Sequence, residues 1–451
     1  MSDKKVMDMT QGPVLSQLTK FAVPVLLGAV FQKIYNFADA YIVGHYLGDE
    51  ALAAVSICSV VMFMLYSINA GITTGVGVVI SQFFGANRPE EMKKAYVASI
   101  YVALGVVVLA TGIGVTTAEP VLRLMQTSEE LMPQAKEYLV IIYAGCIGTM
   151  LYNFCASALR AVGNSVIPLV FLIISSVLNV VLDILFVAVI PMGVGGAALA
   201  TVLAQFLSGV FCMIYMTKIL EFVRVKRGEW KPEKYLIKEV LRYGVPAALQ
   251  MSIITIGDMV LQAVVNTYGT AMIVAYGVCI KVEGIGWDLV CAIGMAVGTF
   301  TGQNIGAGNL SRVRLGVRKA YVLNVIACGI YGVMISVFAP QIMGLFTQSP
   351  DAIQYGVEYM KIFAWFFLAG GILVIFQNFL RSAGDVTFTL MMGVSEIITR
   401  VGFSFLFPAL AGYIGLWFVS PITWVVAAIV GLARYYSNAW EKMAMNSAVA
   451  D

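Results

Sequence analysis

The chain contains two copies of one pattern, separated by 221 positions. The motif Leu-Arg-x-x-Gly at 159–163 returns at 380–384, and Gln-x-x-Gly-Ala at 82–86 returns at 303–307. A chain that repeats itself at this distance consists of two similar halves. In membrane proteins, repeated halves are typical of transporters that move about a site between the repeats.

Apolar stretches fill both halves. Spanning a bilayer core takes about 20 apolar residues, and the sequence offers six such stretches in each half. Their centres lie near residues 34, 66, 105, 147, 177, 207, 255, 286, 327, 367, 397 and 425. Only 12% of the residues are charged, against roughly 25% in soluble proteins. The composition therefore predicts an integral membrane protein made of helices.

The basic residues predict the orientation of these helices. Of the 28 Lys and Arg residues, 22 fall in the termini and in loops on the same side as the termini. Three fall in opposite loops, at Arg123, Lys136 and Lys361, and the other three lie within spans. The positive-inside rule then places both termini in the cytoplasm, as expected for a multi-pass protein of a plasma (inner) membrane. A basic run at 224–238 is read as membrane-surface charge, not as a nucleic-acid site.

Six helices per half bring the chain back to the side on which it started, so the two repeats are parallel. We therefore predict an all-α membrane fold of twelve transmembrane helices in two parallel six-helix bundles. The expected N-terminal bundle covers 14–220, a cytoplasmic linker covers 221–235, and the C-terminal bundle covers 236–436.

Several function classes lack their motifs. The seven cysteines all fall in apolar spans and form no Cys-x-x-Cys pair, so they predict neither a disulfide framework nor a metal site. The chain has a single histidine, His45, which argues against a histidine metal centre. Neither a phosphate-binding Gly-x-x-x-x-Gly-Lys-Ser/Thr loop nor a Gly-x-Ser-x-Gly motif is present. We therefore expect no enzyme and no bound cofactor.

Acidic residues inside spans require an explanation, since each costs on the order of 2.5–3.5 kcal/mol there. Asp39, Asp183 and Thr201 each lie eight residues from the expected outer end of a helix, so they share one depth. Asn179 precedes Asp183 by four residues and Asn36 precedes Asp39 by three, so each amide shares a face with its acid. The all-oxygen set suits a monovalent cation, and two close carboxyls could equally share a proton.

The repeat does not copy this acid pair. Asp39 corresponds to Leu261 and Asp183 to Ser404 in the second half. Because the scaffold evidently does not require the pair, we interpret the pair as serving a specialised task. Hydrogen bonding between helices is the alternative explanation for the amides and the hydroxyl.

The acids of the second half are harder to interpret. Glu396 and Arg400 are four residues apart and are expected to form an ion pair. Asp258 could contact a cationic substrate or pair with Lys281, and the sequence leaves both open. Lys281 also has Glu283 and Asp288 nearby on its own helix. Neutralisation of Lys281 by these neighbours is the simplest interpretation.

Several motifs together resemble the multidrug and toxic compound extrusion (MATE) family. They are the segment 32–44, both Gln-x-x-Gly-Ala helix ends and both Leu-Arg-x-x-Gly turns. The resemblance covers residues 14–436. It implies twelve helices in two lobes that form a V, alternating access, and export of drugs driven by Na⁺ or H⁺.

The resemblance also assigns residues. In the prokaryotic branch with its cation site in the N-terminal lobe, the pattern matches the set Asp39, Asn179, Asp183 and Thr201. Pro24, which the repeat pairs with Pro246, matches the proline at which helix 1 can bend. The candidates for the substrate cavity are Gln32, Tyr35, Asn36, Tyr138, Asn153, Asp258 and Glu283.

Two departures from the family pattern affect these assignments. Lys33 stands where a glutamine is common, and this could alter the preference for substrates. The other prokaryotic branch has an acid in helix 10, where this chain has Gln377 and Asn378, so an ion site in the C-terminal lobe is disfavoured.

The leading hypothesis is a monomeric secondary antiporter that exports amphipathic, cationic organic compounds in exchange for Na⁺ or H⁺. Its expected partners are small-molecule substrates and the bilayer, with no nucleic acid. A flippase for a lipid-linked sugar is the alternative, and it should have a basic central cavity to hold pyrophosphate. An ion channel is a third class, for which the repeat offers no matched acids.

Overall fold

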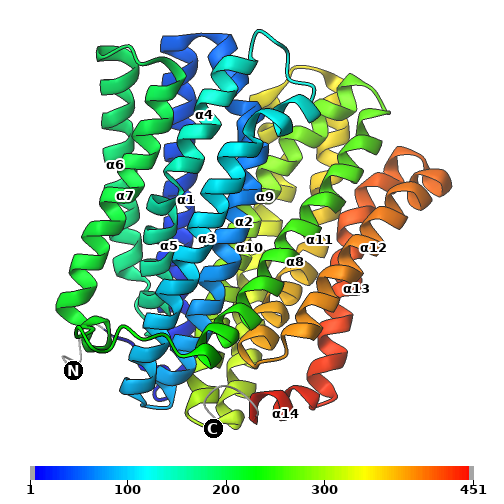
Figure 1. The fold of residues 1–451 in the computed structure, drawn as a ribbon. Coiled ribbons are helices and arrows are strands. Elements are labelled where there is room, and N and C mark those ends of the chain that lie inside the picture. The colour runs from blue at the N-terminus through cyan, green and yellow to red at the C-terminus, as the bar shows by residue number, and fades with distance from the viewer. Residues whose placement is uncertain (1–5, 446–451) are drawn as a thin grey trace. The chain divides into compact units, whose positions relative to one another are not determined.

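The structure is a computed structural model, and it describes residues 6–445. Within that range the chain is almost entirely helical and contains no β-strand (Figure 1). The first half contains α1 (Val14–Leu47), α2 (Asp49–Gly85), α3 (Pro89–Leu124), α4 (Met132–Ala144), α5 (Cys146–Ala161), α6 (Val166–Asp183), the π-helix η1 (Ile184–Val189), α7 (Gly193–Ile219) and the short 3₁₀ helix η2 (Glu221–Val223). The second half contains α8 (Lys234–Asn266), α9 (Thr270–Gly306), α10 (Leu310–Phe346), α11 (Pro350–Ser382), α12 (Val386–Ala411), α13 (Tyr413–Tyr436) and α14 (Ala439–Met445).

The expected membrane spans are present. Ten helices of the described chain are long and apolar enough to cross a bilayer, and the bent pair of α4 and α5 makes an eleventh. The twelfth expected span corresponds to α9, which is not among these helices; it has 37 residues but carries Lys281, Glu283 and Asp288 between its start and its midpoint. The predicted all-helical membrane fold is confirmed.

The chain divides into two compact units. Of the described residues, unit 1 contains 6–7 and Leu27–Ala248, and unit 2 contains Asp8–Leu26 and 249–445. The unit boundaries therefore fall within α1 and α8, whereas the expected boundaries 14–220 and 236–436 describe the sequence repeat and stay a prediction. Each unit includes the first part of a helix whose remainder belongs to the other unit.

The two repeat-related prolines lie next to these boundaries. Pro24 precedes Leu26, the last α1 residue of unit 2, by two positions, and Pro246 precedes Ala248 by the same number. Both helices continue through their proline. A proline inside a helix removes one backbone hydrogen bond, so α1 and α8 are both weakened where they pass from one unit to the other.

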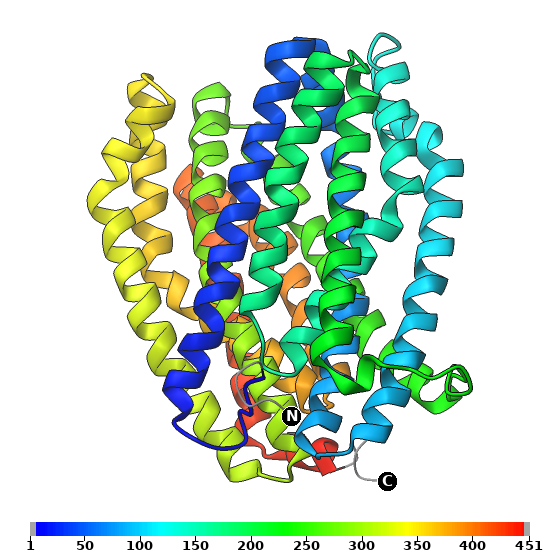
Figure 2. The same cartoon turned by 90° about the vertical axis from the view of Figure 1, so that its left-hand side faces the viewer.

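In unit 1, α7 is the central packing partner, because α4, α5 and α6 all pack against it. The part of α1 that follows Leu27 lies beside α6 (Figure 2), where a side chain at Gly28 would contact Leu172. This arrangement places one face of α1 opposite α6 and α7.

The start of α8 packs against α2 through glycines. A Cβ atom added at Gly71 would lie 2.4 Å from the backbone nitrogen of Ala248, and one at Gly75 would lie 2.5 Å from the carbonyl oxygen of Val240. The two glycines, four residues apart, therefore allow the backbones of α2 and α8 to approach closely.

In unit 2, α11 is the most enclosed helix, and α9, α10 and α13 pack against it. Its buried face includes several aromatic side chains. Phe363, Phe367 and Phe376 of α11 are fully buried, as are Trp417 and Trp424 of α13. These aromatic contacts join α11 to α9 and α13, and α12 packs against α13.

The repeated Leu-Arg-x-x-Gly motif forms the same turn in both units. Gly163 and Gly384 both have positive φ angles, 83° and 87°. The next residue donates its backbone N–H to the leucine carbonyl oxygen at 2.9 Å in each copy, from Asn164 to Leu159 and from Asp385 to Leu380. The glycine is needed because this helix termination requires a left-handed residue.

The second Gln-x-x-Gly-Ala motif holds the segment that precedes α1. Gln303 Oε1 accepts the backbone N–H of Met9 at 2.8 Å. Asn304 Nδ2 and Arg312 Nε donate to the Met9 carbonyl oxygen at 3.1 and 3.0 Å. The Met9 side chain is fully buried, so this segment is an integral part of unit 2.

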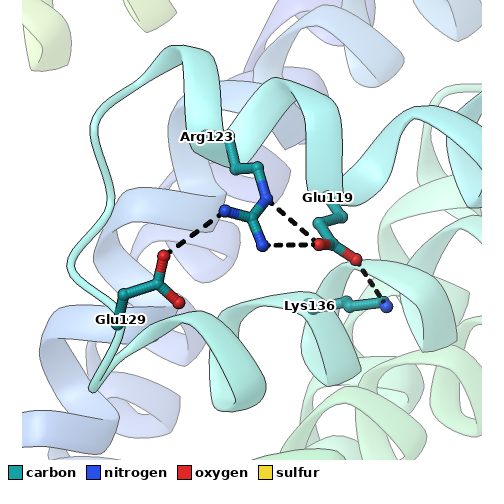
Figure 3. Close-up of polar contacts among 4 residues, drawn as sticks. All are labelled: Glu119, Arg123, Glu129 and Lys136. Atoms are coloured by element: carbon teal, nitrogen blue, oxygen red, sulfur yellow. Dashed lines mark hydrogen bonds and ion pairs between the residues drawn. The ribbon is translucent and has the colours of Figure 1, made fainter.

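Surface ion pairs connect the end of α3 to the start of α4 (Figure 3). Arg123 lies 2.9 Å from Glu119 and 3.3 Å from Glu129, and Lys136 lies 2.8 Å from Glu119. All four side chains are at least one-third exposed, so the pairs order the loop more than they stabilise the fold.

Candidate functional site

Three helices of unit 1 bring the predicted polar residues together. Asp39 lies on α1, Asn179 and Asp183 lie on α6, and Thr201 lies on α7. Asp183 is the last residue of α6, and the π-helix η1 follows it directly. Such π segments widen a helix locally and often occur at functional sites.

The amide and the hydroxyl of this group are bonded to each other. Asn179 Nδ2 lies 3.3 Å from Thr201 Oγ1 and donates to it. Asp183 is fully buried and Asn179 nearly so, whereas Asp39 is half-buried. The carboxyl groups of Asp39 and Asp183 are within hydrogen-bonding reach of each other.

Several oxygens of this group have no donor. Asp39 Oδ1, Asn179 Oδ1 and both carboxylate oxygens of Asp183 are buried without a hydrogen-bond partner among the described residues. Two ionised carboxylates only accept hydrogen bonds, so they cannot bond each other unless one carries a proton. Buried acceptors of this kind are costly when unsatisfied, and a proton or a monovalent cation would satisfy them.

The ligand set also limits the kind of cation. Across residues 6–445, no three His, Cys, Asp or Glu side chains converge in a metal-binding group. The four residues instead offer carboxylate, amide and hydroxyl oxygens, which are hard ligands. The residues present fit Na⁺ or H⁺ better than a transition metal.

Tyrosines and one glutamine surround the acids. Tyr35 on α1 and Tyr66 on α2 both lie within hydrogen-bonding reach of the Gln205 side chain on α7. Thr149 on α5 donates its hydroxyl to Gln205 Oε1. Tyr138 on α4 is buried and lies close enough to Asp39 to interact with it electrostatically.

Sequence reasoning did not identify three of these neighbours, Tyr66, Thr149 and Gln205. One signal was available, because Gln205 lies one helical turn after Thr201 and therefore shares its face. Tyr66 and Thr149 come from other helices, and nothing in their local sequence marks them.

The other cavity candidates of unit 1 are less closely involved. Gln32 lies within hydrogen-bonding reach of Tyr35, and both Gln32 and Asn36 are exposed. Asn153 donates to the carbonyl oxygen of Thr149 at 2.9 Å, which is in its own helix. The structure thus joins Gln32 and Tyr35 to the acid group but gives Asn153 a local partner.

In unit 2, the predicted pair of Glu396 with Arg400 is wrong. Arg400 Nη1 instead donates to Asp258 Oδ1, which comes from α8. Glu396 Oε1 accepts a hydrogen bond from Gln377 Nε2 at 2.7 Å. The spacing of four residues suggested a pair within α12, but it could not show which acid α8 presents to that helix.

The same contact shows that the pairing of Asp258 with Lys281, one of the two interpretations left open by the sequence, is wrong. Contact of Asp258 with a cationic substrate stays a prediction. The ion-pair partner of Asp258 is Arg400, whereas Lys281 lies over the ring of Phe346 at 5.6 Å. Glu283 accepts hydrogen bonds from Trp287 Nε1 at 3.0 Å and from the Tyr359 hydroxyl at 2.8 Å.

The family model for MatE matches residues 24–185 and 246–406, one match in each half of the chain. The chain belongs to the MatE family. This result confirms the family expected from the motifs, and the MatE proteins are membrane transporters, not enzymes.

Named relatives cover nearly the whole chain. A probable multidrug resistance protein of Bacillus subtilis, YpnP, is 32% identical over 97% of this chain and 98% of its own length. The multidrug export protein MepA of Staphylococcus aureus is 23% identical over 97% of this chain and 96% of its own length.

Solved structures share the fold of this MatE protein. A MOP superfamily transporter from Pyrococcus furiosus has a TM-score of 0.89 and 24% identity, and the match covers 99% of both chains. An outward-facing multidrug resistance MATE family transporter has a TM-score of 0.90 and 24% identity, covering 97% of this chain and 99% of the other.

Proposed function

We propose that this protein is a secondary antiporter that exports amphipathic, cationic organic compounds in exchange for Na⁺ or H⁺. The observation that carries the proposal is the group of buried acceptor oxygens on Asp39, Asn179 and Asp183 without donors. A permanent structural group would be expected to have its donors supplied by the protein. A group that binds and releases a cation must instead present free acceptors.

The coupling follows from the charges of the two acids. With both carboxylates ionised, Asp39 on α1 and Asp183 on α6 repel each other across the contact between those helices. A bound Na⁺ or H⁺ removes that repulsion and favours their close approach. Asn179 supplies a further oxygen to the ion, and Thr201 orients Asn179 by accepting its N–H.

Helix α1 can transmit this change, because it belongs to both units. Its residues from Leu27 onward belong to unit 1 with Asp39, and its earlier residues belong to unit 2. If α1 bends at Pro24, the part of α1 after the proline can take different positions. The ion-loaded and ion-free states of unit 1 could then each favour one of these positions. If substrate and ion favour different states, alternating access couples their transport in opposite directions.

The substrate class rests on the relatives and on the charge of the chain. The named relatives from B. subtilis and S. aureus are multidrug resistance or export proteins. Acids outnumber bases within the spans, which favours cationic over anionic substrates. We further propose a monomer in the plasma membrane with both termini in the cytoplasm, as the distribution of Lys and Arg predicts.

Transport of a substrate out of proteoliposomes tests the proposal. Imposing a Na⁺ gradient and a pH gradient separately, with a fluorescent organic cation inside, identifies the coupling ion. Asp39→Asn and Asp183→Asn should each reduce gradient-driven transport by on the order of tenfold or more, since each removes a charged ligand. Asp351→Asn, at the exposed start of α11, is the matched control and should transport normally. Unchanged transport by both site variants would refute the coupling role.

A lipid-linked sugar flippase is not favoured. Recognition of a pyrophosphate would need free intramembrane cations. Arg400 is engaged by Asp258, and Lys281 lies over an aromatic ring. The described part of unit 2 therefore offers no cluster of available cations.

A further inference from the structure

The two side chains of the Asp258–Arg400 ion pair differ in solvent exposure. The Asp258 side chain is 57% exposed, whereas that of Arg400 is 5% exposed. A carboxylate is costly against lipid chains, so the exposed side of Asp258 must face water. A ligand arriving from that water can reach the acid of this pair but not the base.

Arg400 has a second acid beside it. Glu396 lies one turn earlier on α12, is 3% exposed and interacts electrostatically with Arg400. Glu396 is now bonded to Gln377, which is a neutral partner. Arg400 can therefore give up Asp258 without becoming an uncompensated buried charge, which would otherwise be strongly destabilising.

The charges of these three residues do not balance. Asp258 and Glu396 carry two negative charges when ionised, and Arg400 carries one positive charge. Two further groups face them from α9 and α11, namely Glu283 and its hydrogen-bond donor Tyr359. The cluster therefore carries excess negative charge that an additional cation could neutralise. Asp258 is the exposed member of the cluster.

The face of α8 around Asp258 is partly apolar. Ile254, four residues before Asp258, is half-buried, and Leu261, three residues after it, is buried. An exposed acid beside apolar side chains matches a molecule that carries a positive charge on a hydrophobic body.

We propose that Asp258 is the anchor of a binding subsite for a monovalent organic cation in unit 2, and that Arg400 is a built-in competitor for this anchor. The cation pairs with Asp258, and Arg400 turns to Glu396. The inference rests on the proposed function only in taking organic cations as the substrate class. By occupying Asp258 in the absence of substrate, Arg400 weakens the binding of weak or poorly placed cations.

Equilibrium binding to the purified full-length protein tests the subsite. The probe is tetraphenylphosphonium, whose charge does not depend on pH, measured by equilibrium dialysis in Na⁺-free buffer. Asp258→Asn should weaken binding by about tenfold, and Arg400→Gln should strengthen it by about tenfold, because an ion pair of roughly 1.4 kcal/mol is lost or gained. Glu396→Gln should weaken binding, since Arg400 then has only Asp258 as a partner.

The opposite signs distinguish competition from a structural ion pair. If Asp258→Asn and Arg400→Gln shift the affinity in the same direction, or if Asp258→Asn has no effect, the proposal is overturned. Arg400→Lys keeps the positive charge and should bind the probe nearly as the wild type does, so it is the charge-conserving control. If Arg400→Gln does not fold, Glu396→Gln takes its place, and unchanged binding by Glu396→Gln would overturn the competition. Asp351→Asn is the control for a lost acid in the same unit.

The result of the binding experiment can be separated from the result of the transport experiment on Asp39 and Asp183. Dialysis involves no gradient, so loss of ion-driven transport would leave the opposite shifts at Asp258 and Arg400 intact. Conversely, normal coupling through Asp39 and Asp183 with unchanged probe affinity in Asp258→Asn would overturn the subsite alone.

Discussion

Asn179 donates a hydrogen bond to Thr201 at 3.3 Å, and this bond turns the amide oxygen of Asn179 to the side where it has no donor. The contact joins α6 to α7 beside the Asp183 carboxylate. Thr201 therefore acts on the proposed ion site through the orientation of Asn179.

Replacing Thr201 by valine should weaken the response to the coupling ion. The substitution keeps the size of the side chain but removes the acceptor that orients Asn179. We expect the ion concentration for half-maximal transport to rise on the order of tenfold, as for other groups that orient a ligand. Thr217→Val is the control, because the Thr217 hydroxyl on the same helix bonds only to the Ile214 carbonyl oxygen. Equal effects of the two substitutions would argue against the orienting role.

Asp183→Asn should raise the thermal stability of the protein while impairing its coupling. Both Asp183 oxygens lack donors, and an amide would supply two N–H groups to neighbouring acceptors. The expected gain in the free energy of unfolding is about 1 kcal/mol, the usual net value of a hydrogen bond, and it is measured as a higher melting temperature in detergent.

The same substitution at Asp385 should change the melting temperature in the opposite direction. Asp385 is also buried, but its carboxylate accepts a hydrogen bond from Arg434 Nε at 2.6 Å. Asp385→Asn should therefore lower the melting temperature. A decrease for both variants would show that the Asp183 carboxylate is as well satisfied as that of Asp385.

Gln303→Leu should release the segment that precedes α1. The Met9 N–H would lose its acceptor while buried, which costs about 1–3 kcal/mol. Hydrogen–deuterium exchange should increase for the amides around Met9. Gln354→Leu, at an exposed residue bonded only to Glu358 in the next turn, should leave that exchange unchanged. Protection that persists in Gln303→Leu would assign the holding role to Asn304 and Arg312.

Gly75→Ala should disturb the packing of α2 against the start of α8. The added Cβ atom would lie 2.5 Å from the Val240 carbonyl oxygen, and overpacking of this kind costs about 1–3 kcal/mol. Gly105→Ala on α3 has nothing within 4 Å and should be neutral or slightly stabilising. The melting temperatures of the two variants test this prediction. Similar values would contradict the close approach of α2 and α8 at Gly75.

The sequence by itself determined the helical membrane fold, the repeat and the family. These follow from local properties: apolar length predicts spans, and motifs such as Leu-Arg-x-x-Gly dictate a turn that Gly163 and Gly384 both form. The depth argument also placed Asp39, Asn179, Asp183 and Thr201 together, because helical rise converts residue number into height. Their role in coupling stays a prediction.

The tertiary structure alone decided which side chains from different helices meet. Spacing within α12 suggested a pair of Glu396 with Arg400, but α8 supplies Asp258 instead. Likewise, Tyr66 and Thr149 lie near the acids, on α2 and α5, without a signal in their local sequence. The physical reason is that depth along a helix follows from residue number, whereas the neighbour across a helix contact depends on how each helix is rotated and packed.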